Sequence, residues 1–138
     1  MENTMAAMDR LVKEQKVDNI GVSNFSISQL QRAMRVTEES VLTDQVGHHA
    51  YWQNNEIPRF CQANNVILTA YSLIVEGRLV GDEELATIGE RHGKSAAQVA
   101  IRWLLKQENV VTTLGTTDPE QHGRVRLLAE RTRDATDQ

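Results

Sequence analysis

The chain has 138 residues, of which 40% are hydrophobic and 25% are charged, and its formal net charge is −4. This length predicts one domain with a substantial buried core, and the ordinary balance of apolar and charged residues excludes a wholly disordered chain. The acidic net charge argues against nucleic acid or an anionic membrane as the main partner.

The predicted helices and strands alternate along the chain, because apolar residues recur first at helical and then at strand spacing. Helices are predicted over residues 3–15, 26–38, 55–63 and 82–93, then from residue 95 and from residue 118 onward. Strands are predicted over residues 17–22, 41–46, 66–71 and 109–114. This alternation is typical of an α/β fold in which right-handed crossovers join parallel strands.

Two of the predicted helices begin with a capping box, a Ser followed three residues later by Gln. These segments are Ser26 to Gln29 and Ser95 to Gln98. Pro58 falls in the first turn of a third helix, where its missing N–H group is tolerated. The last predicted helix begins with Asp118-Pro119, an Asp cap followed by Pro at the first helical position.

The cysteine content and the lengths of the apolar runs predict the cellular location. A single cysteine, Cys61, excludes an internal disulfide framework and indicates a reducing compartment. No apolar run approaches the about 20 residues that a membrane-spanning helix needs. The amino-terminal segment MENTMAAMDR has no apolar stretch of the kind that marks a secretory signal. We therefore expect a cytoplasmic protein.

Polar residues follow the predicted strands at their carboxyl ends, where parallel α/β folds bind ligands. They are Ser23, Asn24, Gln45, His48, His49, Tyr71, Ser72 and the run from Gly115 to Asp118. Turns also favour Ser, Asn, Asp and Gly, so the pattern alone leaves ligand binding and ordinary turn formation open. The run from Gly115 enters a helix N-terminus, which is either an anion site or a simple cap. Tyr71 is either a stacking platform for a planar ring or a core tyrosine.

Other reactive residue types have structural interpretations. His48 and His49 are adjacent, so on a strand they point to opposite faces, and we expect no metal site. Cys61 lies on the apolar side of a short helix and is expected to be a buried, inert thiol. Asp9 and Lys13 are expected on a solvated helix face.

Five segments in order resemble the aldo-keto reductase family. They are KVDNIGVSNF at 16–25, DQVGHH at 44–49, LTAYS at 68–72, HGKSAAQVAIRWL at 92–104 and GTTDPEQ at 115–121. Each segment is weak evidence alone, but their order and distances make the resemblance specific.

The resemblance implies a (β/α)8 barrel, a fold that typically needs about 250 residues. The chain is similar to its carboxyl-terminal half, strands five to eight, with the half-barrel over 1–133 and a polar tail at 134–138. The family's catalytic Asp, Tyr, Lys and His belong to the first four strands, so no catalytic residue is expected here. The implied function is that of a portion of an NAD(P)H-dependent oxidoreductase that reduces carbonyl compounds by hydride transfer.

By the same resemblance, the chain would carry most of the nicotinamide cofactor site. Ser23, Asn24 and Gln45 would bind the carboxamide, and Tyr71, followed by Ser72, would stack on the nicotinamide ring. The turn of Gly115, Thr116, Thr117 and Asp118, with Gln121, would hold the adenosine ribose and its phosphate. The expected cofactor is NADP(H), with NAD(H) as the alternative. Loops after the strands would contact a small carbonyl substrate, through His48, His49 and Trp52.

Three other interpretations stay open, one of which is a truncated reading frame or a fragment of the longer enzyme. The chain can be a non-catalytic half-barrel that serves as a binding or interaction module, or a complementing subunit that is active when another chain supplies the first four strands. Because strands cut from a closed barrel have unpaired edges, a homo-oligomer or a partner chain is expected.

Overall fold

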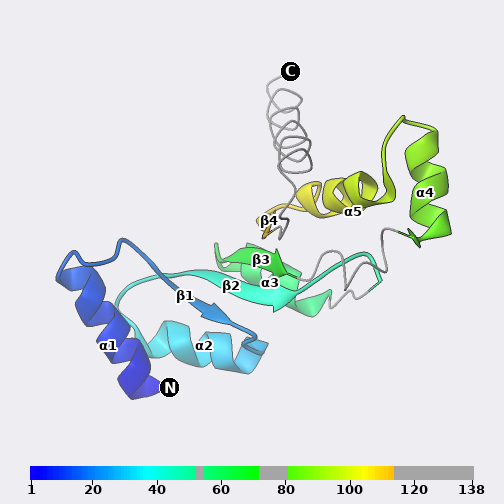
Figure 1. Ribbon diagram of the computed structural model, residues 1–138. Coiled ribbons are helices and arrows are strands. Elements are labelled where there is room, and N and C mark those ends of the chain that lie inside the picture. The colour runs from blue at the N-terminus through cyan, green and yellow to red at the C-terminus, as the bar shows by residue number, and fades with distance from the viewer. Residues whose placement is uncertain (52–54, 72–80, 114–138) are drawn as a thin grey trace.

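The computed structural model describes residues 1–51, 55–71 and 81–113 (Figure 1). Its strands are β1 (Ile20–Ser23), β2 (Val41–Gly47), β3 (Ile67–Tyr71) and β4 (Val110–Thr112). Its helices are α1 (Glu2–Lys13), α2 (Ile27–Val36), α3 (Glu56–Ala63), α4 (Glu83–Glu90) and α5 (Ala96–Leu105). The four strands form one parallel sheet in the order β1-β2-β3-β4. The predicted α/β fold with a parallel sheet is therefore confirmed, while the helix predicted from residue 118 and the boundary at residue 133 lie outside the described residues.

The strand register gives the sheet two different faces. One row across all four strands faces the helices and consists of Val22, Asp44, Leu68 and Val110. Leu68 packs in one buried cluster with Leu30 of α2, Cys61 of α3 and Leu104 of α5. The neighbouring row on the other face is largely polar and partly exposed: Ser23, Gln45, Thr69 and Val111. A hydroxyl pair, Thr43 and Thr69 with oxygens 2.7 Å apart, also lies on this second face.

Both predicted capping boxes form. The Ser26 hydroxyl accepts a hydrogen bond from the Gln29 N–H at 3.3 Å, and the Gln29 side chain accepts one from the Ser26 N–H at 2.8 Å. The same reciprocal pair joins Ser95 and Gln98, at 3.3 and 2.9 Å. These local bonds set the first turns of α2 and α5, because each one satisfies a backbone group that the helix itself leaves free.

Some element boundaries differ from the prediction. β1 begins at Ile20 rather than at residue 17, because Gln15 has φ +56° and Val17 is 40% exposed, so the chain first turns away from α1. α4 ends at Glu90 rather than near Gly93. Gly93 has φ +62° and lies in the turn between α4 and α5.

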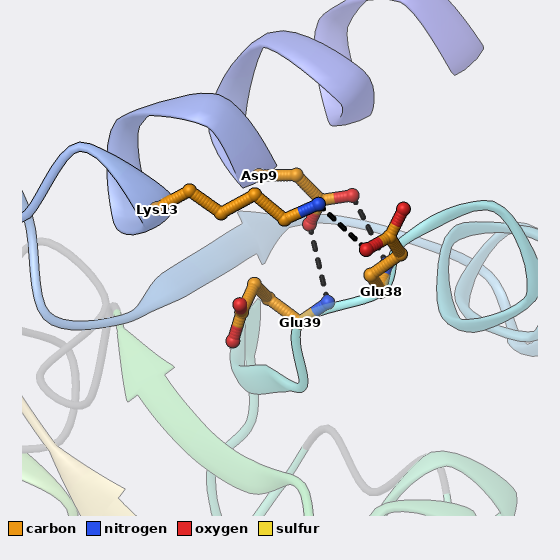
Figure 2. Close-up of polar contacts among 4 residues, drawn as sticks. All are labelled: Asp9, Lys13, Glu38 and Glu39. Carbon is orange, nitrogen blue, oxygen red and sulfur yellow. Dashed lines mark hydrogen bonds and ion pairs between the residues drawn. The ribbon is translucent and has the colours of Figure 1, made fainter.

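The prediction that Asp9 lies on a solvated helix face is wrong. Its side chain is 6% exposed, and its two carboxylate oxygens accept hydrogen bonds from the backbone N–H groups of Glu38 and Glu39, at 3.0 and 3.3 Å. Figure 2 shows Asp9 reaching from α1 to the turn between α2 and β2, beside the exposed ion pair of Lys13 and Glu38. Asp9 therefore joins the first helix to the connection that leads into β2.

No helix within the described ranges is long and apolar enough to cross a membrane.

Candidate functional site

The candidate site lies at the carboxyl ends of β1, β2 and β3, which run side by side in Figure 1. Ser23 of β1 is in register with Gln45 of β2, so their side chains lie on the same face of the sheet. Two residues beyond Gln45, Gly47 of β2 is in register with Tyr71 of β3. The parallel sheet thereby gathers polar groups that are separated by about 20 to 50 residues along the chain.

The end of β1 is tied to β2 through the Gln45 backbone. The Gln45 carbonyl accepts two hydrogen bonds, one from the Ser23 hydroxyl and one from the Asn24 N–H, both 2.9 Å long. Asn24 has φ +57°, a left-handed conformation that Asn tolerates better than most residues. The next N–H, that of Phe25, donates to the Asp44 carboxylate at 3.4 Å. The turn that carries Ser23 and Asn24 is thus held by β2 at three points.

Tyr71 reaches from β3 across β2 to this turn. Its hydroxyl donates a hydrogen bond to Oδ1 of Asn24, at 2.8 Å. A Cβ atom built on Gly47 would lie 3.8 Å from the Tyr71 ring, so the ring passes over Gly47 at ordinary contact distance. The contact closes one side of a small polar corner formed by the four residues Ser23, Asn24, Gln45 and Tyr71, hereafter the polar corner.

The polar corner has free hydrogen-bonding capacity. The Ser23 hydroxyl uses its proton on the Gln45 carbonyl, which leaves its oxygen lone pairs available. Asn24 Nδ2 and the Gln45 side-chain amide make no hydrogen bond to any other residue that the structure describes. Free donors and acceptors beside an aromatic ring fit a planar group that itself donates and accepts hydrogen bonds.

The structure brings together four of the ten predicted cofactor residues. The other six, Ser72, Gly115, Thr116, Thr117, Asp118 and Gln121, lie outside the described residues. The phosphate and ribose part of the predicted site therefore remains a prediction.

Asp44 is a buried carboxyl on the face of the sheet opposite Gln45, and its burial was not expected from the sequence. Its side chain is 0% exposed, and Oδ2 has no hydrogen-bond partner among the residues that the structure describes. Burial raises the pKa of Asp44 above the usual aspartate value, and the weak bond from Phe25 opposes this only in part. The alternation of β2 could have shown that Asp44 and Gln45 face opposite sides, but a charged residue on the core side is not expected from patterning.

His48 does not reach the candidate site, so the suggestion that it contacts substrate is wrong. It is 2% exposed and packs on the helix side, with its ring centroid 5.5 Å from that of Trp103 and Nε2 3.0 Å from the Gln107 side-chain oxygen. Burial and the neighbouring His48 lower the pKa of His49, whose Nδ1 is buried and has no partner within the described part of the chain. Trp52 lies outside the described residues.

Metal and thiol chemistry find no support in the described part of the chain. No group of three or more His, Cys, Asp or Glu side chains there could hold a metal ion. Cys61 is 0% exposed, and burial raises the pKa of its thiol to about 11, with the nearby Asp44 as a second cause. The predicted buried thiol is therefore confirmed.

Sequence comparison relates the chain to one enzyme family. A model of the Aldo/keto reductase family matches residues 1–125. The glyoxal reductase of Bacillus subtilis (strain 168) is 36% identical over 111 residues, which are 80% of this chain and 40% of that protein. The NAD(P)H-dependent 6'-deoxychalcone synthase of Glycine max is 42% identical over 94 residues, 64% of this chain and 30% of that protein.

Solved structures show the same relationship in three dimensions. A putative 2,5-diketo-D-gluconic acid reductase B superposes with a TM-score of 0.84 and 32% identity, over 91% of this chain and 43% of that one. The protein Gox0644, solved in complex with NADPH, superposes with a TM-score of 0.80 and 30% identity, over 87% of this chain and 44% of that one. The chain thus spans less than half the length of these relatives.

Proposed function

Because the chain belongs to the aldo/keto reductase family, we propose that it forms the nicotinamide-binding portion of an oxidoreductase that reduces carbonyl compounds. The observation that carries this proposal is the polar corner, in which three strand ends place free amide and hydroxyl groups beside the Tyr71 ring. In this proposal the chain corresponds to strands five to eight of the family barrel, with the half-barrel over 1–133 and a polar tail at 134–138.

The residues of the polar corner have two tasks. Ser23, Asn24 and Gln45 bind the carboxamide, and the Tyr71 ring packs against the nicotinamide plane. When bound, the nicotinamide supplies the hydride for carbonyl reduction. The bonds from Ser23 and Asn24 to the Gln45 carbonyl fix the positions of these groups before the cofactor arrives, which lowers the ordering cost of binding.

The rest of the dinucleotide is assigned to residues beyond the described part. The turn from Gly115 to Asp118, with Gln121, would hold the adenosine ribose and its phosphate, since glycine and a helix N-terminus favour a phosphate. Ser72, next to Tyr71, is also assigned to the cofactor site. NADP(H) is the proposed cofactor, with NAD(H) as the alternative. We propose that the acid that protonates the product, and the other catalytic groups, come from outside these 138 residues.

An NMR titration of the 15N-labelled chain tests the cofactor site. NADP+ should shift the backbone amides of Ser23, Asn24 and Gln45 and those from Gly115 to Gln121, with a dissociation constant of about 0.1–1 mM for an open site. Tyr71→Ala should weaken binding because the stacking surface is lost, whereas Tyr51→Ala, at an exposed tyrosine outside the corner, should not. The proposal fails if millimolar NADP+ and NAD+ both leave these amides unmoved in a folded sample.

A second candidate function is a non-catalytic interaction module or complementing subunit. It is favoured by the sheet itself, since within the described residues β1 pairs only with β2, and the face that carries Thr43, Thr69 and Val111 is partly exposed. Such a sheet can pair with a second copy or with a chain that supplies the remaining strands. Light scattering should then show a dimer or higher oligomer at micromolar concentration, and a strictly monomeric, compact species would contradict it.

A further inference from the structure

Asp44 places a buried carboxyl group next to the residues of the polar corner. It precedes Gln45 in β2, so the two side chains lie on opposite faces of the sheet. Its Oδ1 accepts a hydrogen bond of 3.4 Å from the N–H of Phe25, the residue that follows Asn24. Its side chain is 0% exposed, and Oδ2 has no partner among the described residues. The carboxyl group therefore contacts the turn of the polar corner from the helix side of the sheet.

No counter-ion accompanies this carboxyl group in the part of the chain that the structure describes. None of the ion pairs found there includes Asp44. The side chains that β1, α2, β3 and α5 place in the neighbouring core are apolar: Val22, Leu30, Leu68 and Leu104. From α3 comes Cys61, whose thiol is uncharged at neutral pH because its pKa is raised to about 11. A negative charge on Asp44 thus stays unbalanced within these residues.

An unbalanced charge of this kind acts beyond its own contacts. Buried surroundings screen a charge much less than water does, so its field extends across the strand to the other face of the sheet. The four residues of the polar corner carry amide, hydroxyl and phenol groups, which do not by themselves distinguish a charged ring from an uncharged one. The oxidised nicotinamide ring carries one positive charge and the reduced ring carries none, while the phosphates are the same in both. Asp44 can therefore tell the two forms apart by charge.

We propose that Asp44, in its ionised form, is a specificity-determining residue by which the cofactor site favours the oxidised, positively charged nicotinamide ring over the reduced, uncharged one. This inference rests on the proposed function. Asp44 acts through its charge from the far side of β2 and needs no contact with the ring. If the oxidised form binds more tightly, the bound reduced form becomes a better hydride donor by the same factor, because the binding and redox equilibria are linked. That direction suits the reduction of a carbonyl compound.

The preference should depend on pH through Asp44 itself. Burial raises the pKa of Asp44 above the usual aspartate value. A positively charged ring favours the carboxylate, so bound NADP+ should lower this pKa relative to a bound uncharged ring. The protonated carboxyl group has no charge with which to select. We therefore expect the preference for the oxidised ring to be absent in acid and to appear as Asp44 ionises.

An NMR titration of the full chain compares NADP+ with 1,4,5,6-tetrahydro-NADP, an acid-stable analogue whose ring is uncharged. Between pH 4.5 and pH 8.5 the ratio of the two dissociation constants should change about four- to sixteenfold in favour of NADP+. Coulomb's law gives this range for unit charges about 10 Å apart at an effective dielectric constant of about 20 to 40. The 13C signal of the Asp44 carboxyl group should titrate at lower pH with NADP+ than with the analogue.

Two matched variants assign the effect to Asp44. Asp44→Asn removes the charge but keeps an oxygen that can accept from the Phe25 N–H, so its ratio should stay at the acid value at every pH. Asp18→Asn, at an exposed aspartate before β1, should keep the pH-dependent ratio of the unmodified chain. His48 and His49 are present in all three proteins, so a pH dependence that survives Asp44→Asn would belong to other groups and would overturn the inference.

The outcomes separate the two proposals. If the unmodified chain binds neither dinucleotide, the proposed function falls, and this inference falls with it. If it binds both but with a ratio that does not change with pH, or if the Asp44 carboxyl signal shows no ionisation up to pH 8.5, only the role of Asp44 is overturned. A merely structural Asp44 would alter the affinity for both ligands equally, so the ratio is the deciding measurement.

Discussion

The carboxyl group of Asp44 and the thiol of Cys61 are buried together between the sheet and α3, and both side chains are 0% exposed. Negative charge on Asp44 contributes to the raised pKa of Cys61, after burial itself. Such a buried carboxyl is costly in its charged form, because it loses its hydration and only the long bond from the Phe25 N–H compensates for this among the described residues. Two predictions follow from this pair.

Asp44→Asn should stabilise the chain at neutral pH. In the unfolded chain an aspartate ionises near pH 4, whereas burial raises the pKa of folded Asp44 above that value. The free energy of unfolding therefore decreases as pH rises from below the unfolded pKa to above the folded one, and it levels off beyond. Asparagine removes this loss, and its oxygen can still accept from Phe25, while its buried NH2 group lacks an acceptor among the described residues and offsets part of the gain. We therefore expect a net gain of up to about 1 kcal/mol at pH 7.

Urea unfolding between pH 3.5 and pH 8 measures this effect. The difference between Asp44→Asn and the unmodified chain should disappear toward the acid end, where Asp44 is protonated in both states. Asp18→Asn provides the matched control, because Asp18 is exposed and the substitution should leave the pH profile as it is. A destabilised Asp44→Asn variant at pH 7 would show that the ionised carboxylate has a partner that contributes stability.

Cys61 should resist thiol reagents in the folded chain. With a pKa of about 11 the thiolate fraction at pH 8 is about one in a thousand, and the side chain has no exposed surface. Labelling with an aromatic disulfide should therefore follow global unfolding and should be fast in 6 M guanidinium. Because burial is the larger cause of the raised pKa, Asp44→Asn should not make the folded thiol reactive, and fast labelling of either folded protein would refute this account.

Isolated chain supplied with NADPH and a panel of aldehydes should show no turnover above background. The described residues at the strand ends supply amides, hydroxyls and an aromatic ring, and in the proposed function the proton donor comes from elsewhere. The measurement is the loss of NADPH absorbance, with heat-unfolded chain as the control. A saturable, protein-dependent rate that survives repurification would place a catalytic group within these residues.

Much of the fold could be predicted because its signals are local. The capping boxes at Ser26 and Ser95 need only a Gln three residues later, and both form as expected. The meeting of Ser23, Gln45 and Tyr71 could also be predicted, since parallel strands end at one edge of a sheet.

Contacts between distant segments could not be predicted in the same way. The role of Asp9 depends on where Glu38 lies, 29 residues away, and helical spacing alone placed Asp9 in solvent. The Tyr71 bond to Asn24 likewise depends on strand register and on the positive φ of Asn24, and neither is encoded within a short window. The burial of Asp44 goes against the general preference of charged residues for solvent.

Asp9→Ala should destabilise the chain by about 1–3 kcal/mol, because it leaves two backbone N–H groups, those of Glu38 and Glu39, without their acceptor. Glu38→Gln breaks the nearby ion pair with Lys13 but keeps the Asp9 bonds, and since that pair is exposed it should change the unfolding midpoint little. Urea denaturation of both variants measures the free energy of unfolding. It shows whether Asp9 acts as a buried acceptor for the two N–H groups or only as one of several surface charges. Equal effects of the two substitutions would contradict the burial of Asp9 (Figure 2).

Gly89→Ala should destabilise the protein at the turn between α4 and α5. A Cβ atom at Gly89 would lie 2.3 Å from the Lys94 carbonyl oxygen, and backbone on both sides must move to accommodate it. The same two residues are joined by a hydrogen bond, which the Lys94 N–H donates to the Gly89 carbonyl at 2.9 Å. Lys94 immediately precedes Ser95, the N-cap of α5. We expect a loss of about 1–3 kcal/mol in the free energy of unfolding, the usual cost of overpacking.

Gly81→Ala is the matched control for the substitution at Gly89. A Cβ atom at Gly81 would meet no atom of the described residues within 4 Å, and its φ is not in the left-handed region, so alanine should fit without strain. By restricting the unfolded chain it should leave stability unchanged or raise it by up to about 1 kcal/mol. Thermal and urea unfolding of the two variants under one buffer give the comparison. If Gly89→Ala proved as stable as Gly81→Ala, the turn between α4 and α5 would accommodate a Cβ atom at Gly89. The close approach of the Lys94 carbonyl would then have no energetic consequence.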